Sequence, residues 1–199
     1  GGIYLTHRRV ATRIMPAMPN RWKPNVTVSA IIERDGRFLL VEEQTADGLR
    51  LNTPAGHLDP SESPVDACVR EVMEETAYSF TPTALVGIYM NRFVRTRTGS
   101  DITYLRFAFT GDLGMHHAQR HLDDGIVRSV WLSLDELKAT EHLHRSPIVL
   151  ESVGDYLAGQ RYDIGLIHAD ASIYKVPQLT RPVPEEAGAT LDDVLVQIH

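Results

Sequence analysis

The sequence predicts an α+β protein, an α/β/α sandwich in which a mixed β-sheet lies between helices. β-branched and apolar runs separated by turn residues occupy the first part of the chain, and a glutamate-rich helix pattern interrupts them after residue 63. Two more helix patterns follow the last strand pattern. With 199 residues and 43% apolar content, we expect one domain at residues 22–173, an N-terminal arm at 1–21 and a Pro-containing tail at 174–199.

The strand patterns are expected to form hairpins. Asp35-Gly36 separates a β-branched run at residues 26–32 from a second run at 37–43, which predicts a tight turn. A polar loop is expected at 44–50 and a short strand at 51–53. Further strands are predicted at 84–94 and 102–110, joined by a turn-forming loop with Arg95 and Arg97.

The second half of the chain should hold one strand and two core-packing helices. A long connection is predicted at residues 111–125, and its histidines, 116, 117 and 121, are interpreted as ordinary loop residues. A strand is expected at 126–132. Ser133 and Glu136 have the spacing of a capping box that opens a helix to about residue 140, and a second helix is expected at 147–158. A short capped segment is predicted at 190–198.

The central helix is predicted to begin at Ser63 or Pro64, because serine is a good N-cap, proline suits the first helical position and Asp66 completes a capping box. A spacing of 100° per residue gathers an apolar stripe that should face the core: Val65, Cys68, Val69, Val72 and Thr76, with Met73 at its edge. We interpret Cys68, the single cysteine, as a buried small hydrophobe and not as a nucleophile.

Glu71, Glu74 and Glu75 stand at i, i+3 and i+4 of this helix, so their carboxylates gather on one flank. Like charges at this spacing repel one another, and Mg²⁺ or Mn²⁺ would neutralise them. The alternative is a solvated acidic face. Upstream, Gly56 permits a tight backbone path, and Glu62 and Arg70 have the spacing for a bidentate pair that fixes the loop on the helix.

The spacing of Gly56, Glu62, Arg70-Glu71-Val72 and Glu74-Glu75 resembles the signature of the Nudix hydrolases. Two positions depart from it, because the family usually has glycine at Ala77 and an aliphatic residue at Tyr78. Glycine suits a left-handed helix end, so Ala77 either carries about 1 kcal/mol of strain or the helix exits differently. The resemblance continues from about residue 22 to 173, where the chain is similar to small bacterial phosphatases of this family.

This resemblance implies the fold named above and Mg²⁺-dependent hydrolysis of phosphoanhydride bonds in small nucleotides or related pyrophosphates. It implies a catalytic set of Arg70, Glu71, Glu74 and Glu75, with the Ala55 carbonyl as a further metal ligand and Gly56 and Glu62 in structural support. It also implies an extra acidic residue before the last strand, for which Asp124 or Asp123 is the candidate. A pyrophosphohydrolase that releases pyrophosphate and a non-catalytic nucleotide sensor are the alternatives.

Substrate contacts are expected from the hairpin at 84–110. Arg92 and Arg106 lie inside its predicted strands, where they can hold substrate phosphates; the alternative is that they are solvated. Tyr89 and Tyr104 are candidates for stacking on a base, although aromatic residues in strands commonly belong to the core.

The composition limits the other partners. A net charge of −6 argues against binding of a nucleic-acid polymer, which needs clustered Lys and Arg. No apolar run is long enough to span a membrane, and no hydrophobic signal segment opens the chain. We therefore expect a cytoplasmic protein that acts on a small nucleotide or pyrophosphate, as a monomer or a homodimer.

Overall fold

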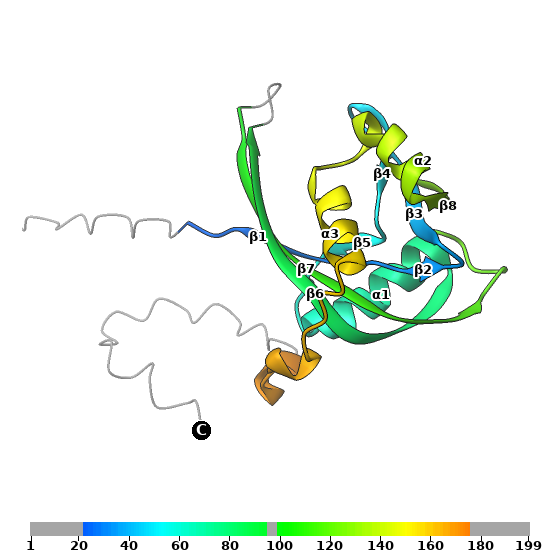
Figure 1. Ribbon diagram of the computed structural model, residues 1–199. Helices are drawn as coiled ribbons and strands as arrows, with labels where there is room; N and C mark the ends of the chain where they lie inside the picture. The colour runs from blue at the N-terminus through cyan, green and yellow to red at the C-terminus, as the bar shows by residue number, and fades with distance from the viewer. Residues whose placement is uncertain (1–21, 95–98, 176–199) are drawn as a thin grey trace, which may run out of the picture.

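Two four-stranded sheets form the centre of the computed structural model, which describes residues 22–94 and 99–175 (Figure 1). The first sheet has the order β5-β1-β7-β6, and β1 and β7 run parallel while the other neighbours are antiparallel. Its strands are β1 (Asn25–Ala30), β5 (Ala55–His57), β6 (Tyr78–Val94) and β7 (Asp101–His116). The predicted mixed sheet is therefore confirmed.

The second sheet is entirely antiparallel. Strand β3 (Arg37–Thr45) pairs with β2 (Glu33–Arg34), β4 (Gly48–Asn52) and β8 (Ile126–Ser133). Asp35 and Gly36 both have positive φ, at 52° and 74°, so the predicted turn is present, and it joins β2 to β3. The hairpin predicted between the runs at 26–32 and 37–43 was partly wrong, because most of the first run forms β1 and pairs with β5 and β7 in the other sheet. The polar loop predicted at 44–50 was wrong, because β3 and β4 continue their pairing as far as Thr45 and Gly48 and leave only a tight turn.

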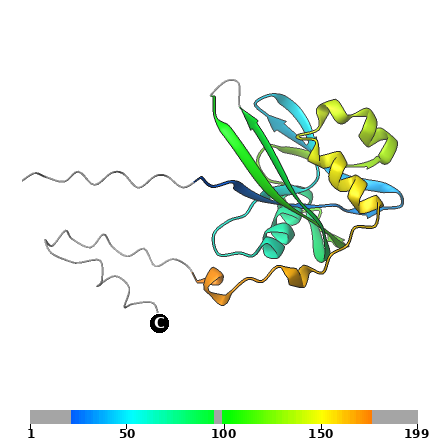
Figure 2. The ribbon, with the colours of Figure 1, turned by 60° about the vertical axis from the view of Figure 1, so that its left-hand side comes forward.

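Helices cover both faces of the first sheet, as the two views of Figures 1 and 2 show. Neighbouring residues of β6 and β7 alternate between two core clusters: Leu85 and Phe109 pack with helix α1 (Pro64–Thr76), whereas Val86 and Ala108 pack with helix α3 (Ile148–Leu157). Helix α2 (Leu134–Ala139) covers β8 and adds Leu137 to the second cluster. This layering confirms the α/β/α arrangement.

Three short 3₁₀ helices complete the described chain: η1 (Glu141–Leu143), η2 (Ile164–Leu166) and η3 (Ala171–Tyr174). The long connection predicted at 111–125 was partly wrong, because β7 continues to His116. Backbone hydrogen bonds to β6, such as the register pair of Leu113 with Phe80, extend that strand beyond its apolar run. Arg95, Arg97, the segment 190–198, the arm 1–21 and residues 176–199 of the tail lie outside the described residues.

Helix α1 begins and ends as its sequence indicates. The Ser63 hydroxyl accepts a hydrogen bond from the Asp66 N–H, and the Asp66 carboxylate accepts one from the Ser63 N–H, each at 3.1 Å. Ala77 ends the helix in the left-handed region, with φ 57° and ψ 21°. Within the described residues, the structure has no helix with the length and apolar character that crossing a membrane requires.

Candidate active site

The inward face of α1 differs from the predicted stripe. Cys68 and Val72 are fully buried as expected, but Val69 is 36% exposed. Two glutamates, Glu71 and Glu75, turn inward in its place, and each residue is only 8% exposed. The apolar pattern missed this rotation because it assigned the charged residues to the outer flank. The helix therefore buries carboxylates on the side that meets β5.

Gly56 makes the approach of β5 possible. A Cβ atom at this position would collide with the carboxylate of Glu71. One residue earlier, the Ala55 N–H donates a 2.8 Å hydrogen bond to Oε2 of Glu75. The strand thus contacts both buried glutamates, and the backbone of Ala55 lies directly beside the Glu75 carboxylate.

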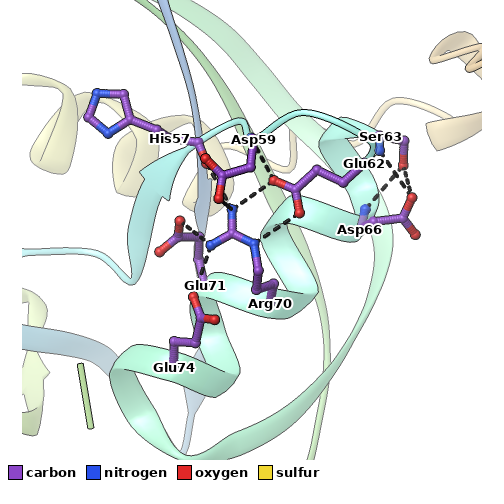
Figure 3. A network of polar contacts seen from close by, with 8 residues as sticks. All are labelled: His57, Asp59, Glu62, Ser63, Asp66, Arg70, Glu71 and Glu74. Atoms are coloured by element: carbon purple, nitrogen blue, oxygen red, sulfur yellow. Dashed lines mark hydrogen bonds and ion pairs between the residues drawn. The ribbon is translucent and has the colours of Figure 1, made fainter. Parts of the chain in front are cut away.

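Arg70 connects the loop before α1 to the glutamates of the helix, as Figure 3 shows. Its Nε and Nη2 donate to both oxygens of Glu62 at 2.9 and 2.7 Å, which is the bidentate pair predicted from the spacing. Nη1 donates to Glu71 at 2.7 Å and to Glu74 at 2.9 Å. Nη2 also reaches the His57 carbonyl at 2.9 Å. One guanidinium therefore fixes the loop, the end of β5 and two glutamates together.

Burial strongly affects the ionisation of the inward carboxyls. Burial raises the pKa of Glu75 to about 9, and the charges of Glu71, Glu43 and Asp123 add to this effect, while the hydrogen bond from Ala55 opposes it. Burial also raises the pKa of Glu71, although its ion pair with Arg70 acts in the opposite direction. A positive charge brought between these groups would favour their ionised forms.

Two acidic residues from other elements approach this cluster. Asp123 is one of the two candidates for the extra acid. Its negative charge contributes to the raised pKa of both Glu71 and Glu75, and its N–H donates a 3.1 Å hydrogen bond to the Glu74 carbonyl. No described contact brings Asp124 to the carboxylates. The sequence analysis did not identify Glu43 on β3. Residues two positions apart in a strand lie on the same face, so the spacing of Glu43 from Leu39 and Val41 could have indicated that it shares their face.

The two candidate arginines lie on opposite faces of the first sheet. Arg106 approaches Thr27 Oγ1 and Asn52 Oδ1, both at 3.4 Å, and the negative charges of Glu43 and Glu75 favour its protonated form. Burial lowers the pKa of Arg106, yet an arginine stays protonated at neutral pH. Arg92 instead makes a bidentate pair with Asp101 on the surface, where its side chain is 67% exposed. The structure brings only Arg106 to the acidic cluster.

An aromatic group lies next to Arg106 on the same face of the sheet. Tyr104, two residues before Arg106 on β7, stacks on Phe93 with ring centroids 5.7 Å apart and an angle of 19°. The His57 ring lies 6.0 Å from Tyr104. The other candidate, Tyr89, donates a 2.7 Å hydrogen bond to Asp155 and packs with the core. Both tyrosines therefore flank Arg106: Tyr104 on its own strand, and Tyr89 directly opposite it on β6, held by Asp155.

The donors available to a metal ion are carboxylate and backbone oxygens, which suit hard divalent cations such as Mg²⁺. As they are placed, the described residues contain no group of three His, Cys, Asp or Glu side chains already gathered around one point. Arg70 lies between Glu71 and Glu74 and compensates their charge. Metal binding through Glu74 would require its carboxylate to turn away from Arg70. The same holds for the Glu71 oxygen that Arg70 binds at 2.7 Å, whereas Glu75 has no described contact with Arg70 and lies against the backbone of Ala55.

The combination of this fold with an Arg-Glu network on α1 defines a class of protein. Residues 23–152 match the NUDIX domain family, and the chain belongs to the Nudix hydrolases. A NUDIX hydrolase from Nitrosomonas europaea has a similar structure, with a TM-score of 0.69 and 47% identity over 74% of this chain and 98% of that protein. The E. coli ORF135 protein, at 24% identity and a TM-score of 0.53 over 68% of this chain and 90% of that one, shares the fold.

Among proteins of known name, the chain is similar to the phosphatase NudJ of Escherichia coli K12. The two sequences are 37% identical over 147 residues, which cover 73% of this chain and 92% of NudJ. The resemblance predicted from the motif and its flanking runs is therefore confirmed.

Proposed function

We propose that this chain catalyses Mg²⁺-dependent hydrolysis of phosphoanhydride bonds in nucleoside tri- and diphosphates and in related small pyrophosphates. The observation that carries the proposal is the burial of Glu71 and Glu75 against the backbone of Ala55. A buried, ionised carboxylate is costly unless a positive charge offsets it. The likeness to a phosphatase supports the same reaction class.

The proposed metal ligands are Glu71, Glu74, Glu75 and the Ala55 carbonyl, with Mn²⁺ as an alternative to Mg²⁺. When bound, the cation supplies Lewis acidity and a lowered pKa for a water molecule. The protein supplies orientation. Arg70 holds Glu71 and Glu74 by ion pairs of 2.7 and 2.9 Å and is itself held by Glu62.

In the proposed reaction a water molecule attacks phosphorus and the phosphoanhydride bond breaks. Glu71, buried and beside Asp123, is the group that accepts the proton of this water. Arg106 is proposed to bind a phosphate oxygen, because its only described side-chain partners are two neutral oxygens at 3.4 Å. Asp123 is the proposed extra acid, since it lies near both buried glutamates.

The stacked pair of Tyr104 and Phe93 supports an aromatic substrate group. Tyr104 is two strand positions from Arg106, so both side chains project from the same face about 7 Å apart. A base or a pyrimidine ring that stacks there would place its attached phosphates toward Arg106 and the carboxylates. This arrangement fits nucleotides and the pyrophosphate of a thiamine pyrimidine precursor.

The proposal is tested by incubating the purified chain with GTP, GDP, other nucleotides and thiamine-precursor pyrophosphate, with Mg²⁺ or with EDTA, and identifying the products by ³¹P NMR. Release of orthophosphate only with Mg²⁺ would support it. Release of pyrophosphate would establish the pyrophosphohydrolase alternative, and nucleotide binding without any turnover would establish the sensor. A cytoplasmic location and a monomeric or homodimeric state remain predictions.

A further inference from the structure

The connection from β7 to β8, residues 117–125, lies against the C-terminal end of α1. The His117 N–H donates to the Ala77 carbonyl at 2.8 Å, and the Asp123 N–H donates to the Glu74 carbonyl at 3.1 Å. Carbonyls at the C-terminal end of a helix have no partner within the helix, so these two bonds satisfy groups that would otherwise need water. The connection is therefore docked on the end of α1 at two points.

Side chains add to this docking. The Tyr78 ring packs on the His116 ring, with centroids 4.5 Å apart and an angle of 40°. The Ser79 hydroxyl is hydrogen-bonded to Nε2 of His117 at 2.8 Å, in a partly buried position. Two consecutive residues after α1 thus contact two consecutive histidines at the end of β7. We name these four residues, Tyr78, Ser79, His116 and His117, the helix-exit cluster.

A β-bulge makes such side-chain contacts important at this end of the hairpin. Tyr78 pairs with His116, but Phe80 pairs with Leu113, so the register of β6 and β7 shifts between the two. A bulge interrupts the regular ladder of backbone hydrogen bonds and bends the strand. Backbone pairing therefore constrains this end less than it constrains the rest of the hairpin, and the helix-exit cluster supplies further contacts there.

Tyr78 is also one of the two departures from the family signature, which usually has an aliphatic residue at this position. The Arg34 guanidinium lies over its ring at 5.7 Å from the centroid, and over the Trp131 ring at 5.1 Å. An aliphatic side chain would offer no ring to Arg34 or to His116. The departure therefore joins the exit of α1 to β2 and to the connection that follows β7.

Asp123 depends on this connection for its place. Its side chain is exposed and makes no contact with another described side chain, so only the backbone of residues 117–125 brings it toward Glu71 and Glu75. We infer that the helix-exit cluster positions Asp123 for the reaction. Its members are positioning residues and do not touch the substrate. The effect on catalysis rests on the role proposed above for Asp123, whereas docking of the connection does not require turnover.

Hydrogen exchange of the full chain, followed by NMR, tests the docking directly, because the Asp123 amide donates to the Glu74 carbonyl. We expect this amide to exchange about fivefold faster in Ser79→Ala and in Tyr78→Leu, since each variant loses a contact that keeps the connection docked. Tyr78→Phe is the matched control, because it keeps the ring and should exchange like wild type.

The amides of β1 provide the reference for global unfolding. Exchange at Asp123 that is unchanged in Ser79→Ala and Tyr78→Leu would overturn the inference. Equal acceleration at Asp123 and in β1 would also overturn it, because the helix-exit cluster would then contribute only to the stability of the whole fold.

Steady-state kinetics measure the consequence for the reaction. Ser79→Ala and His117→Ala should each lower kcat about threefold or more and leave KM nearly unchanged, because the proposed substrate contact Arg106 lies farther along the hairpin. In an Asp123→Asn background the same substitutions should have no further effect, since the carboxylate that they position is gone. Additive losses in that background would contradict the inference. A chain that shows the exchange result but hydrolyses nothing would refute only the proposed function.

Discussion

Replacing Glu75 by glutamine is expected to stabilise the metal-free protein at alkaline pH. Burial raises the pKa of this carboxyl to about 9 in the folded protein, against 4.5 in its reference state. The unfolded chain therefore releases the proton near pH 4.5 while the folded chain keeps it. The raised pKa contributes its full stabilisation of the folded state below pH 4.5, and this stabilisation is lost as the pH rises toward 9. The glutamine side chain of the variant cannot ionise, so the variant escapes this loss.

The magnitude follows from the pKa difference. Each pKa unit corresponds to about 1.4 kcal/mol, so at pH 8 the difference is at most about 5 kcal/mol. Water penetration and the ion pairs of neighbouring residues reduce such values, and we expect about 2 kcal/mol or more. Urea unfolding in EDTA at pH 5 and pH 8 measures the effect. Glu42→Gln is the control. It also replaces a glutamate, next to Glu43 on β3, but one that pairs with the exposed Arg128.

The expected pattern is similar stability of wild type and Glu75→Gln at pH 5, and a more stable variant at pH 8. An equal pH dependence of the two proteins would show that Glu75 ionises normally in the folded state. The reasoning about the buried carboxyl would then be wrong. Added Mg²⁺ should stabilise wild type at pH 8 more than it stabilises the variant.

Three further substitutions test separate parts of the structure. Gly56→Ala forces a Cβ into the Glu71 carboxylate, so activity should fall at least tenfold with a loss of about 1–3 kcal/mol in urea unfolding. Arg70→Lys cannot reproduce the guanidinium fork and should lower kcat by about tenfold or more, which a phosphate-release assay measures. Ala77→Gly should stabilise the fold by about 1 kcal/mol, because Ala77 has a left-handed φ of 57°.

Each of these has an outcome that contradicts it. Normal activity of Gly56→Ala would mean that β5 does not need its close approach to α1. An unaffected Arg70→Lys enzyme would mean that a single charge, without bidentate geometry, is enough to orient the glutamates. A destabilised Ala77→Gly would mean that the flexibility of glycine in the unfolded chain outweighs the relief of strain.

Local spacing predicted the parts of the site that lie within one stretch of chain. Three such features are the cap of α1, the pair of Arg70 with Glu62 and the close passage of Gly56. Each involves residues fewer than twenty apart in sequence, and the helix fixes how those residues lie relative to one another. The same reasoning applies to the turn at Asp35. These features could be predicted because each depends on one element and its neighbour.

Residues brought together by the tertiary fold could not be predicted in this way. Glu43 and Arg145 come from a strand and a connecting segment about a hundred residues apart, and only the pairing of β3, β4 and the segment at His144 brings them together. The inward rotation of Glu71 and Glu75 was missed for a different reason. Periodicity assigns charged residues to the solvent side, whereas a functional site buries them at a cost in stability.

The central claim is that the glutamates of α1 bind a divalent cation, and titration of Mn²⁺ followed by electron paramagnetic resonance tests it most directly. Wild type and Glu42→Gln should bind the ion equally well, whereas Glu71→Gln and Glu74→Gln should weaken binding by at least about tenfold while the circular dichroism spectrum stays the same. If Mn²⁺ affinity is the same in all four proteins, the glutamates do not bind the cation and the account of the site is refuted.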